Sequence, residues 1–370
     1  MRSQLLIDNW TLQSCSELLS SGLQGDTSAD LLVGATSLSS LYEDISADVV
    51  RIEALFQSLN DVVFSDELLL DVQFSHTWSQ FGALQPLLEN RIIITKPLLE
   101  VKSRWVPLRE AIAAELCTTQ VLLERHAENI ASWKSTRTSV DGFFSQLVWG
   151  GAGMLARADF LKLPYSAHPS RATLFRRAGL FPISSGAHEQ LEKFVNSERV
   201  KIFKNQKSGI NGAVILPPAV VQILSEAVSV SDLFKVAIDL RNEYADIRRW
   251  IAQFQHALDC ENAKELLSRE KLLRSVTRDL DTLSSPSVFG DVSMQFGAFF
   301  PKLSVKLGSP ISAIAKHFGI RAQIKRLICA QAGRKAFRRM LHLFGEEKSK
   351  LGRSVEREFF RRSAVVADKT

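Results

Sequence analysis

The sequence predicts a mostly α, multi-helix protein with a long helical hairpin and at most one small β-hairpin. Three observations favour this class. Glycine (19 residues) and proline (11 residues) are both below average usage for a chain of 370 residues. Leu, Ala, Glu, Arg and Lys, which have high helix propensity, fill long uninterrupted stretches. In several of these stretches apolar residues recur at helical spacing, which indicates helices that bury one face.

Charge is distributed unevenly along the chain. Residues 1–100 hold four basic and fourteen acidic side chains, whereas residues 301–370 hold seventeen basic and five acidic ones. The net charge of +6 therefore combines an acidic N-terminal part with a basic C-terminal part. This asymmetry indicates a polyanionic partner, an anionic membrane surface, or association of the two ends. We expect an acidic helical region (1–160), a central region (161–285) and a basic C-terminal helical region (286–370).

Two helices are predicted in the acidic region. Apolar residues recur at helical spacing in 47–60, and a proline suited to a first helical turn opens a second helix over 107–134. Between them, the β-branched run 91–95 is consistent with a strand or with the end of a helix. The apolar run 143–156 is shorter than the roughly 20 residues that a membrane-spanning helix needs, so we interpret it as buried core or a tight helix contact.

The central region contains the strongest helical pattern. A proline-rich connection near 160–185 precedes the best β-hairpin candidate, 199–216, where two β-branched runs flank a turn-forming stretch. Segment 231–258 then predicts one continuous helix, and segment 262–283 carries a second apolar stripe that would close an antiparallel helical hairpin. Packing within one chain is favoured over a dimer seam. The stripe of the first helix consists of Leu233, Ala237, Leu240, Tyr244, Ile247, Ile251, Phe254 and Leu258.

A Ser-, Gly- and Pro-rich stretch, 284–310, leads into the basic region, where residues 311–328 resemble part of a helix-turn-helix. Ala315 and Gly319 take the positions of the packing alanine and the turn glycine of that motif. The apolar residue expected six positions after the glycine is Lys325 instead. A single helix with a glycine interruption on a basic surface is the alternative that the sequence favours.

Two basic clusters are candidate binding sites. Arginine can fork onto phosphates, so the first cluster suits nucleic acid, although it equally suits a solvated helix face. Its members are Lys316, Arg321, Lys325, Arg326, Arg334, Lys335, Arg338 and Arg339. The second cluster lies in a proline-flanked turn and short helix whose N-terminus could hold an anion, or it bridges acidic residues elsewhere in the fold. Its members are His168, Arg171, Arg176 and Arg177.

A search for catalytic chemistry is negative. The glycines of 149–153 are not followed by the Gly-Lys-Ser/Thr of a phosphate loop, and neither a nucleophile elbow nor a His-Glu-x-x-His zinc motif occurs. The four cysteines are widely spaced, which suggests neither a zinc site nor disulfides and favours reduced, buried thiols. We predict no cofactor and no metal.

We therefore expect a non-enzymatic interaction protein that binds a protein partner, or itself, through helical surfaces. The alternatives are a nucleic-acid-binding protein that uses residues 311–339 and an enzyme of a class that the sequence does not reveal. The apolar run near the start is broken by Asp8 and Asn9, unlike the core of a signal peptide, and no transmembrane segment is predicted. A cytoplasmic location is expected.

Overall fold

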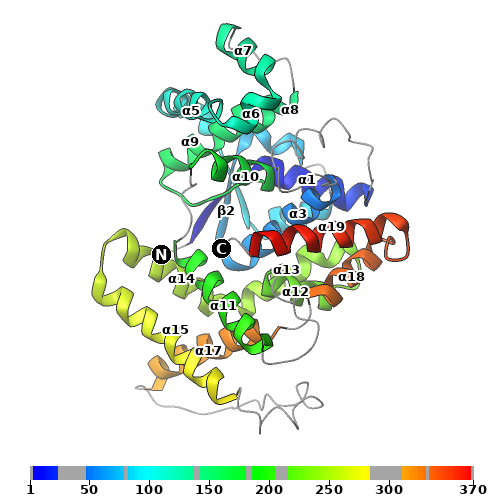
Figure 1. Ribbon diagram of the computed structural model, residues 1–370. Helices are drawn as coiled ribbons and strands as arrows, with labels where there is room; N and C mark the ends of the chain where they lie inside the picture. The colour runs from blue at the N-terminus through cyan, green and yellow to red at the C-terminus, as the bar shows by residue number, and fades with distance from the viewer. Residues whose placement is uncertain are drawn as a thin grey trace. The chain divides into compact units, whose positions relative to one another are not determined.

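The computed structural model is mostly helical, which confirms the predicted fold class, and four short strands add one small parallel sheet (Figure 1). It describes residues 3–23, 47–78, 82–136, 142–180, 186–204, 216–283, 311–330 and 333–367. The chain divides into two compact units. The helical unit consists mainly of Gly186–Ile210 and Glu243–Gln331, and the sheet unit consists of Arg2–Ser185, Asn211–Asn242 and Ala332–Thr370.

The parallel sheet was not predicted. Its strands are β1 (Gln4–Ile7), β2 (Glu67–Asp71), β3 (Ile93–Lys96) and β4 (Tyr165–Ser166). Every residue of β2 is buried, because helices cover the sheet, so the strand reads as a continuous apolar run without the alternation that reveals a half-exposed strand. Only β3 lies in a segment, 91–95, for which a strand was one of the two interpretations.

The strand order is β3-β2-β1-β4, and all pairs are parallel. After β3 the chain crosses to the other side of β1, so the order of strand addition changes direction at β1. The first three strands progress outward from β1 on one side, and β4 returns to pair with β1 on the other side. In open parallel sheets the carboxyl ends of the strands at such a point form a crevice that commonly holds functional groups. Here the residues that follow β1 and β4 occupy that position.

The main helix of the sheet unit is α3 (Ala47–Phe64), which confirms the helix predicted for 47–60. It packs against α1 (Asn9–Ser21), α10 (Pro169–Arg177), α12 (Pro218–Glu226) and α19 (Lys350–Ala367). Its central residues Ile52, Leu55 and Leu59 have no exposed surface. The helix is therefore part of the buried core of the sheet unit.

The single helix predicted for 107–134 is wrong. This stretch contains parts of three helices, α5 (Lys102–Leu116), α6 (Gln120–Arg125) and α7 (Ala127–Thr136), and Pro107 lies inside α5 rather than in its first turn. The first break is at Thr119, which has extended backbone angles (φ −64°, ψ 125°). The apolar spacing continues across the breaks, so the spacing alone did not reveal them.

The run 143–156 is buried, as predicted. It covers the end of α8 (Gly142–Phe144), a π-helical turn η5 (Ser145–Gly150) and the first half of α9 (Gly151–Leu161). Helix α9 packs against α5. At this contact Gly153 faces Arg109 of α5, since a Cβ on the glycine would lie 3.4 Å from Cδ of Arg109.

The first strand of the predicted hairpin 199–216 is wrong, because residues 199–204 belong to α11 (Gly186–Lys204). Residues 205–215, which would form its turn and most of its second strand, lie outside the described residues. Arg199 is fully buried in α11, and it donates from Nη2 to the carbonyl of Ala330 (3.2 Å).

The continuous helix predicted for 231–258 is also wrong, although its partner was predicted correctly. The segment forms α13 (Leu233–Glu243) and α14 (Ala245–Asp259), separated at Tyr244, where the backbone leaves the helical region (φ −94°, ψ 18°). Helix α14 packs against α15 (Ala263–Leu283), which confirms the helical hairpin. Seven of the eight predicted stripe residues are buried, and Leu258 is half-buried. The two halves belong to different units, a division that periodicity alone does not show.

The helix-turn-helix resemblance is not realised in the structure. Residues 311–329 form one helix, α17 (Ile311–Cys329), with Gly319 inside it rather than at a turn. A Cβ added to Gly319 would lie 3.0 Å from Oδ2 of Asp246 on α14, so the glycine permits a close approach of α17 to α14.

The C-terminal helix α19 packs on α3, and α18 (Gly333–Leu343) packs on α12 and α19. Phe56 of α3 contacts Phe359 of α19 and Phe337 of α18, with ring centroids 5.6 Å and 6.3 Å apart. The acidic N-terminal part and the basic C-terminal part of the chain are therefore associated within the sheet unit, through aromatic rings.

Short elements complete the described chain: η2 (Val72–Thr77), η3 (Gly82–Leu84), α4 (Gln85–Glu89), η4 (Leu98–Val101) and η7 (Val230–Asp232). Within the described ranges no helix has the length and apolarity needed to cross a membrane. Cys15 and Cys117 are buried, as expected, but Cys260 and Cys329 are exposed, so the expectation of buried thiols is wrong for those two.

Candidate nucleic-acid interface

The eight residues of the first basic cluster are divided between two helices and two units. Helix α17, in the helical unit, carries Lys316, Arg321, Lys325 and Arg326, and α18, in the sheet unit, carries Arg334, Lys335, Arg338 and Arg339. The side chain of Lys316 lies outside the described residues. On α17, Arg326 forms an ion pair with Glu243, whose carbonyl also accepts a hydrogen bond from Gln323 (2.5 Å). Part of this charge therefore holds α17 within its own unit.

Helix α18 separates its apolar and basic residues cleanly. Ala336, Phe337, Met340 and Leu341 are buried, whereas Arg334, Lys335, Arg338 and Arg339 are exposed. The two sets follow the 3.6-residue period, so they lie on opposite faces of the helix.

Helix α19 repeats this arrangement. Val355, Phe359 and Phe360 are buried, and the basic residues Lys350, Arg353, Arg357 and Arg361 are exposed. The last three are four residues apart and therefore share one face. With a rise of 1.5 Å per residue, this row of arginines is about 12 Å long.

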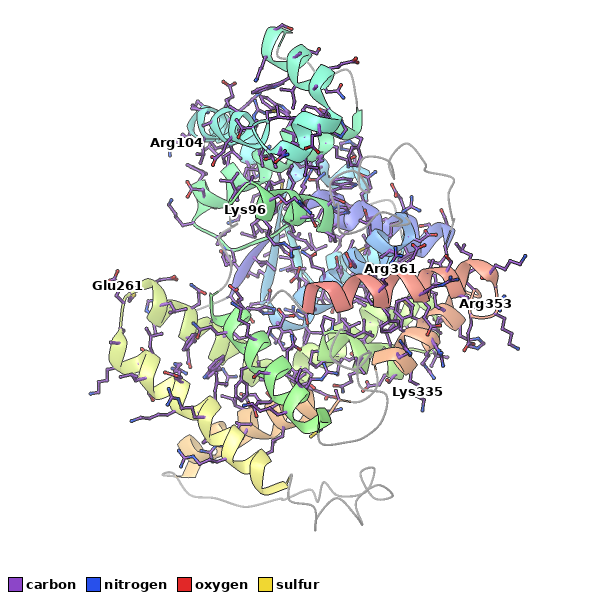
Figure 2. All side chains as sticks on the ribbon, viewed as in Figure 1. Lys96, Arg104, Glu261, Lys335, Arg353 and Arg361 are labelled. Carbon is purple, nitrogen blue, oxygen red and sulfur yellow. The ribbon has the colours of Figure 1, made fainter. Side chains whose placement is uncertain are left out.

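Aromatic packing fixes the two helices against each other. The rings of Phe337 and Phe359 have centroids 4.6 Å apart, and Phe360 contacts Phe337 at 5.2 Å. The exposed basic side chains point outward from this core, and Figure 2 shows Lys335 and Arg353 projecting away from the ribbon. We call these residues the basic face: Arg334, Lys335, Arg338, Arg339, Lys350, Arg353, Arg357 and Arg361.

Some members of the basic face have partners. Arg338 forms an ion pair with Glu356 (3.0 Å), and Arg339 donates from Nη2 to the carbonyl of Ala227 (2.9 Å). Lys335, Arg353 and Arg357, in contrast, have no acidic partner among the residues that the structure describes. The face therefore carries surplus positive charge.

Helix stability does not account for where these charges lie. Arg334 and Lys335 are in the first turn of α18, and Lys350 is the first residue of α19. A cation close to a helix N-terminus opposes the helix dipole, at a cost of about 0.3–1 kcal/mol. Arg334 offsets part of this cost, because its guanidinium lies 4.9 Å from the ring centroid of Phe360 on α19.

The second predicted cluster lies at the carboxyl edge of the sheet, and half of its residues are buried. His168 and Arg171 are buried, whereas Arg176 and Arg177 are exposed. Asp8, directly after β1, forms an ion pair with Arg171 (Nη1 to Oδ1, 2.5 Å). An acidic residue of the N-terminal part thus supplies the anion, in agreement with the bridging alternative from the sequence.

Asp8 has no exposed surface, and its carboxylate accepts four hydrogen bonds. Besides Arg171, the donors are the hydroxyl of Tyr165 (2.5 Å) and the backbone N–H groups of Trp10 and His168 (3.0 Å each). Burial by itself would raise the pKa of Asp8, but the Arg171 charge and the hydrogen bonds from the backbone N–H of His168 and the hydroxyl of Tyr165 lower it below 3.8. Burial and the neighbouring Asp8 raise the pKa of Tyr165 well above 10, so the phenol stays protonated and donates.

His168 is also fully engaged. Its ring stacks on Trp10 with centroids 3.9 Å apart, Nδ1 accepts from the N–H of Ser170 (3.3 Å), and Nε2 lies 3.2 Å from Oγ of Ser14. Since Nδ1 accepts, Nε2 carries the proton and donates to the hydroxyl. These contacts leave neither ring nitrogen free, so the residue holds the start of α10 against α1.

The glycines of the 149–153 segment make room for arginines. Nε and Nη2 of Arg171 donate to the carbonyl of Gln146 in the π-helical turn (3.2 and 2.6 Å). A Cβ on Gly150 would lie 2.4 Å from Nη2 of Arg171, and one on Gly153 would lie 3.0 Å from Nη1 of Arg157. The segment is thus a place where two guanidinium groups pack closely on a helix.

A second aspartate–arginine pair, which the sequence analysis missed, lies at the end of β2. Asp71 accepts from Nε of Arg157 (2.9 Å), and the guanidinium lies 3.9 Å from the ring centroid of Trp105. Burial lowers the pKa of Arg157, while Asp71 opposes that shift. The sequence does carry a signal for both aspartates, because each one ends a short apolar run, Leu-Leu-Ile-Asp for Asp8 and Leu-Leu-Leu-Asp for Asp71.

Compared with known proteins, the chain matches no family model, no curated protein and no solved structure. Across the described part of the chain, no group of three or more His, Cys, Asp or Glu side chains is arranged to hold a metal ion. The assignment of function therefore depends on the geometry of this chain alone.

Proposed function

We propose that this protein binds nucleic acid through the basic face of α18 and α19. The observation that supports this most strongly is the surplus of exposed Arg and Lys on two helices whose opposite faces form one aromatic core. The aromatic core fixes the two helices relative to each other, so the backbone positions that carry the guanidinium groups are set before a phosphate binds.

The spacing of the arginines suits a phosphate backbone. The row Arg353, Arg357 and Arg361 extends about 12 Å. One strand of a duplex carries a phosphate about every 3.4 Å along the helix axis, so the row faces about three to four phosphates.

Nucleic acid is favoured over a lipid surface. Membrane-binding helices combine basic residues with exposed apolar side chains that enter the headgroup region. The exposed large hydrophobic residues of the described chain are Val72, Leu123, Val228 and Leu267, and none of them lies on α18 or α19.

A salt series with the full-length protein tests the proposal. If Lys335, Arg353 and Arg357 each neutralise one phosphate of random-sequence duplex DNA, log K should fall with log salt with a slope of about −2.7 or steeper. Affinity would then fall about 40-fold between 50 and 200 mM salt. Fluorescence anisotropy of labelled duplex and single-stranded oligonucleotides measures both quantities.

The triple variant K335Q/R353Q/R357Q should lose most of this slope. A matched control with three exposed cations elsewhere, K162Q/K193Q/R274Q, should bind as the parent does, because those residues have acidic partners within their own helices. The proposal is overturned if both variants lose the salt dependence of binding equally, or if the parent protein does not bind at low salt. Binding to anionic vesicles but not to oligonucleotides would assign the face to a membrane instead.

A further inference from the structure

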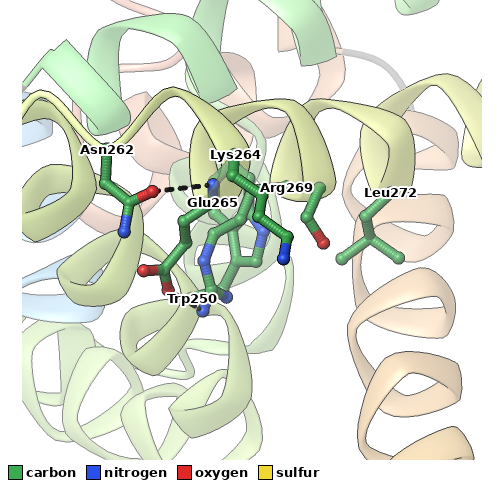
Figure 3. Close-up of a pocket in the computed structure, with 7 residues that line it drawn as sticks. Trp250, Asn262, Lys264, Glu265, Arg269 and Leu272 are labelled. Atoms are coloured by element: carbon green, nitrogen blue, oxygen red, sulfur yellow. Dashed lines mark hydrogen bonds and ion pairs between the residues drawn. The ribbon is translucent and has the colours of Figure 1, made fainter.

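A small pocket lies in the helical unit, between α14 and the first turns of α15 (Figure 3). Its volume is about 330 Å³. The lining residues are Trp250, Asn262, Lys264, Glu265, Ser268, Arg269 and Leu272. None of these residues belongs to either basic cluster of the sequence or to the basic face.

Two buried donors at this pocket have no acceptor. Trp250 is only 1% exposed, and its indole Nε1–H has no hydrogen-bond partner among the described residues. The buried Nε of Arg269 is in the same condition. Buried indole N–H groups usually find a partner, because leaving a donor unsatisfied is costly. Two such donors at one pocket indicate that an acceptor group belongs there.

The remaining polar groups add donors and positive charge. Lys264 is exposed and has no ion-pair partner in the described part of the chain. The side-chain oxygen of Asn262 accepts from the N–H of Glu265 (3.2 Å) at the start of α15, which leaves the amide nitrogen of Asn262 available as a donor. The positive end of the 21-residue helix α15 therefore faces the same space.

One carboxylate is present, and it is already engaged. Glu265 forms an ion pair with Nη2 of Arg269 (2.9 Å). With Lys264 and Arg269 opposed by a single acid, the lining keeps one positive charge in excess. Leu272 and the indole ring contribute an apolar wall beside these donors.

We propose that this pocket binds a small organic anion, in which a phosphate or carboxylate group meets Trp250, Lys264 and Arg269 and an apolar group lies against Leu272. The volume is at the lower end of the range for small-molecule sites, which limits the ligand to a compact one. The inference is independent of the nucleic-acid proposal, because it uses other residues and a ligand of a different size.

The test uses the full-length protein and three probes: inorganic phosphate, phenyl phosphate and benzoate. Calorimetry gives the affinity, and the indole ¹⁵N–¹H signal of Trp250, assigned by its loss in W250F, reports hydrogen bonding at that atom. Phenyl phosphate or benzoate should bind more tightly than inorganic phosphate and shift the Trp250 signal. Which of the two binds better identifies the acid group of the ligand.

Two variants locate the binding. W250F keeps an aromatic ring of smaller size and removes the indole N–H, and K264Q removes an exposed charge that the fold does not need. Each variant should weaken binding about tenfold or more, as expected for a hydrogen bond to a charged group. K271Q, on an exposed position of α15 outside the pocket, should bind within about twofold of the parent. If no probe shifts the Trp250 signal, or if K264Q and W250F bind as the parent does, the proposal is wrong.

Discussion

Replacing Asp8 by Asn should destabilise the sheet unit strongly while changing almost no volume. The carboxylate has no exposed surface, and it neutralises Arg171, which is itself buried and only 2% exposed in its side chain. The amide keeps one acceptor oxygen but presents an N–H₂ group to donors that previously met an oxygen. A buried guanidinium without its counterion costs about 3–5 kcal/mol. We therefore expect D8N to lose about that much free energy of unfolding.

Urea denaturation, followed by circular dichroism, measures the loss. D159N is the control, because Asp159 forms an exposed ion pair with Lys162 (3.0 Å) and such pairs contribute about 0–1 kcal/mol. The double variant D8N/R171M removes both charges, so it should be less destabilised than the sum of the single variants. If D8N unfolds within 1 kcal/mol of the parent, or if the two losses simply add, the pair is not the buried electrostatic contact described.

Three further outcomes follow from the same geometry. In the folded protein the pKa of Asp8 lies below 3.8. The Asp8 carboxylate therefore stabilises the fold fully above pH 3.8, and this stabilisation is lost as the pH falls through the folded-state pKa. In an acid titration, D8N should lose less free energy of unfolding than the parent over this range. G150A should destabilise the protein by about 1–3 kcal/mol in thermal melts, since its Cβ would overlap a guanidinium nitrogen, whereas G142A, with open space around it, should not. Burial raises the pKa of Cys15 to about 12, so a thiol reagent at pH 8 should label exposed Cys260 and leave Cys15 unmodified until the protein unfolds.

The sequence was sufficient to predict the helices that bury only one face. The helix α3 and the hairpin of α14 with α15 present a single apolar stripe, and the period of that stripe identifies both the helix and its buried face. It does not identify where a helix stops. At Tyr244 and Thr119 the apolar spacing continues although the backbone does not, so two long helices were predicted where the chain forms five shorter ones.

The parallel sheet was missed for the opposite reason. Strand β2 is buried on both faces and β1 is only four residues long, so neither shows the alternation that marks a strand. Missing the sheet also meant missing its carboxyl edge. Asp71 and Arg157 are 86 residues apart in the chain, and only the topology of the sheet brings them together.

The basic residues were found by composition, but their grouping required the structure. Residues 316–326 and 334–339 are adjacent in the chain, yet they belong to different units. Conversely, α19 carries Glu356 and Glu358 among its arginines, but Glu356 lies beside Arg338 and the row from Arg353 to Arg361 remains exposed. The pocket at Trp250 had no sequence signal, since its donors come from both helices of the hairpin.

The charge asymmetry of the chain has two separate structural consequences. Acids of the N-terminal part are used internally, where Asp8 and Asp71 neutralise buried arginines of α10 and α9. The C-terminal helices are attached to α3 by aromatic rings around Phe56. Two arginines of the basic face add polar contacts, because Arg338 pairs with Glu356 and Arg339 donates to the carbonyl of Ala227. Lys335, Arg353 and Arg357, in contrast, have no acidic partner among the described residues, and under the proposed function these three are the charges that attract a polyanion.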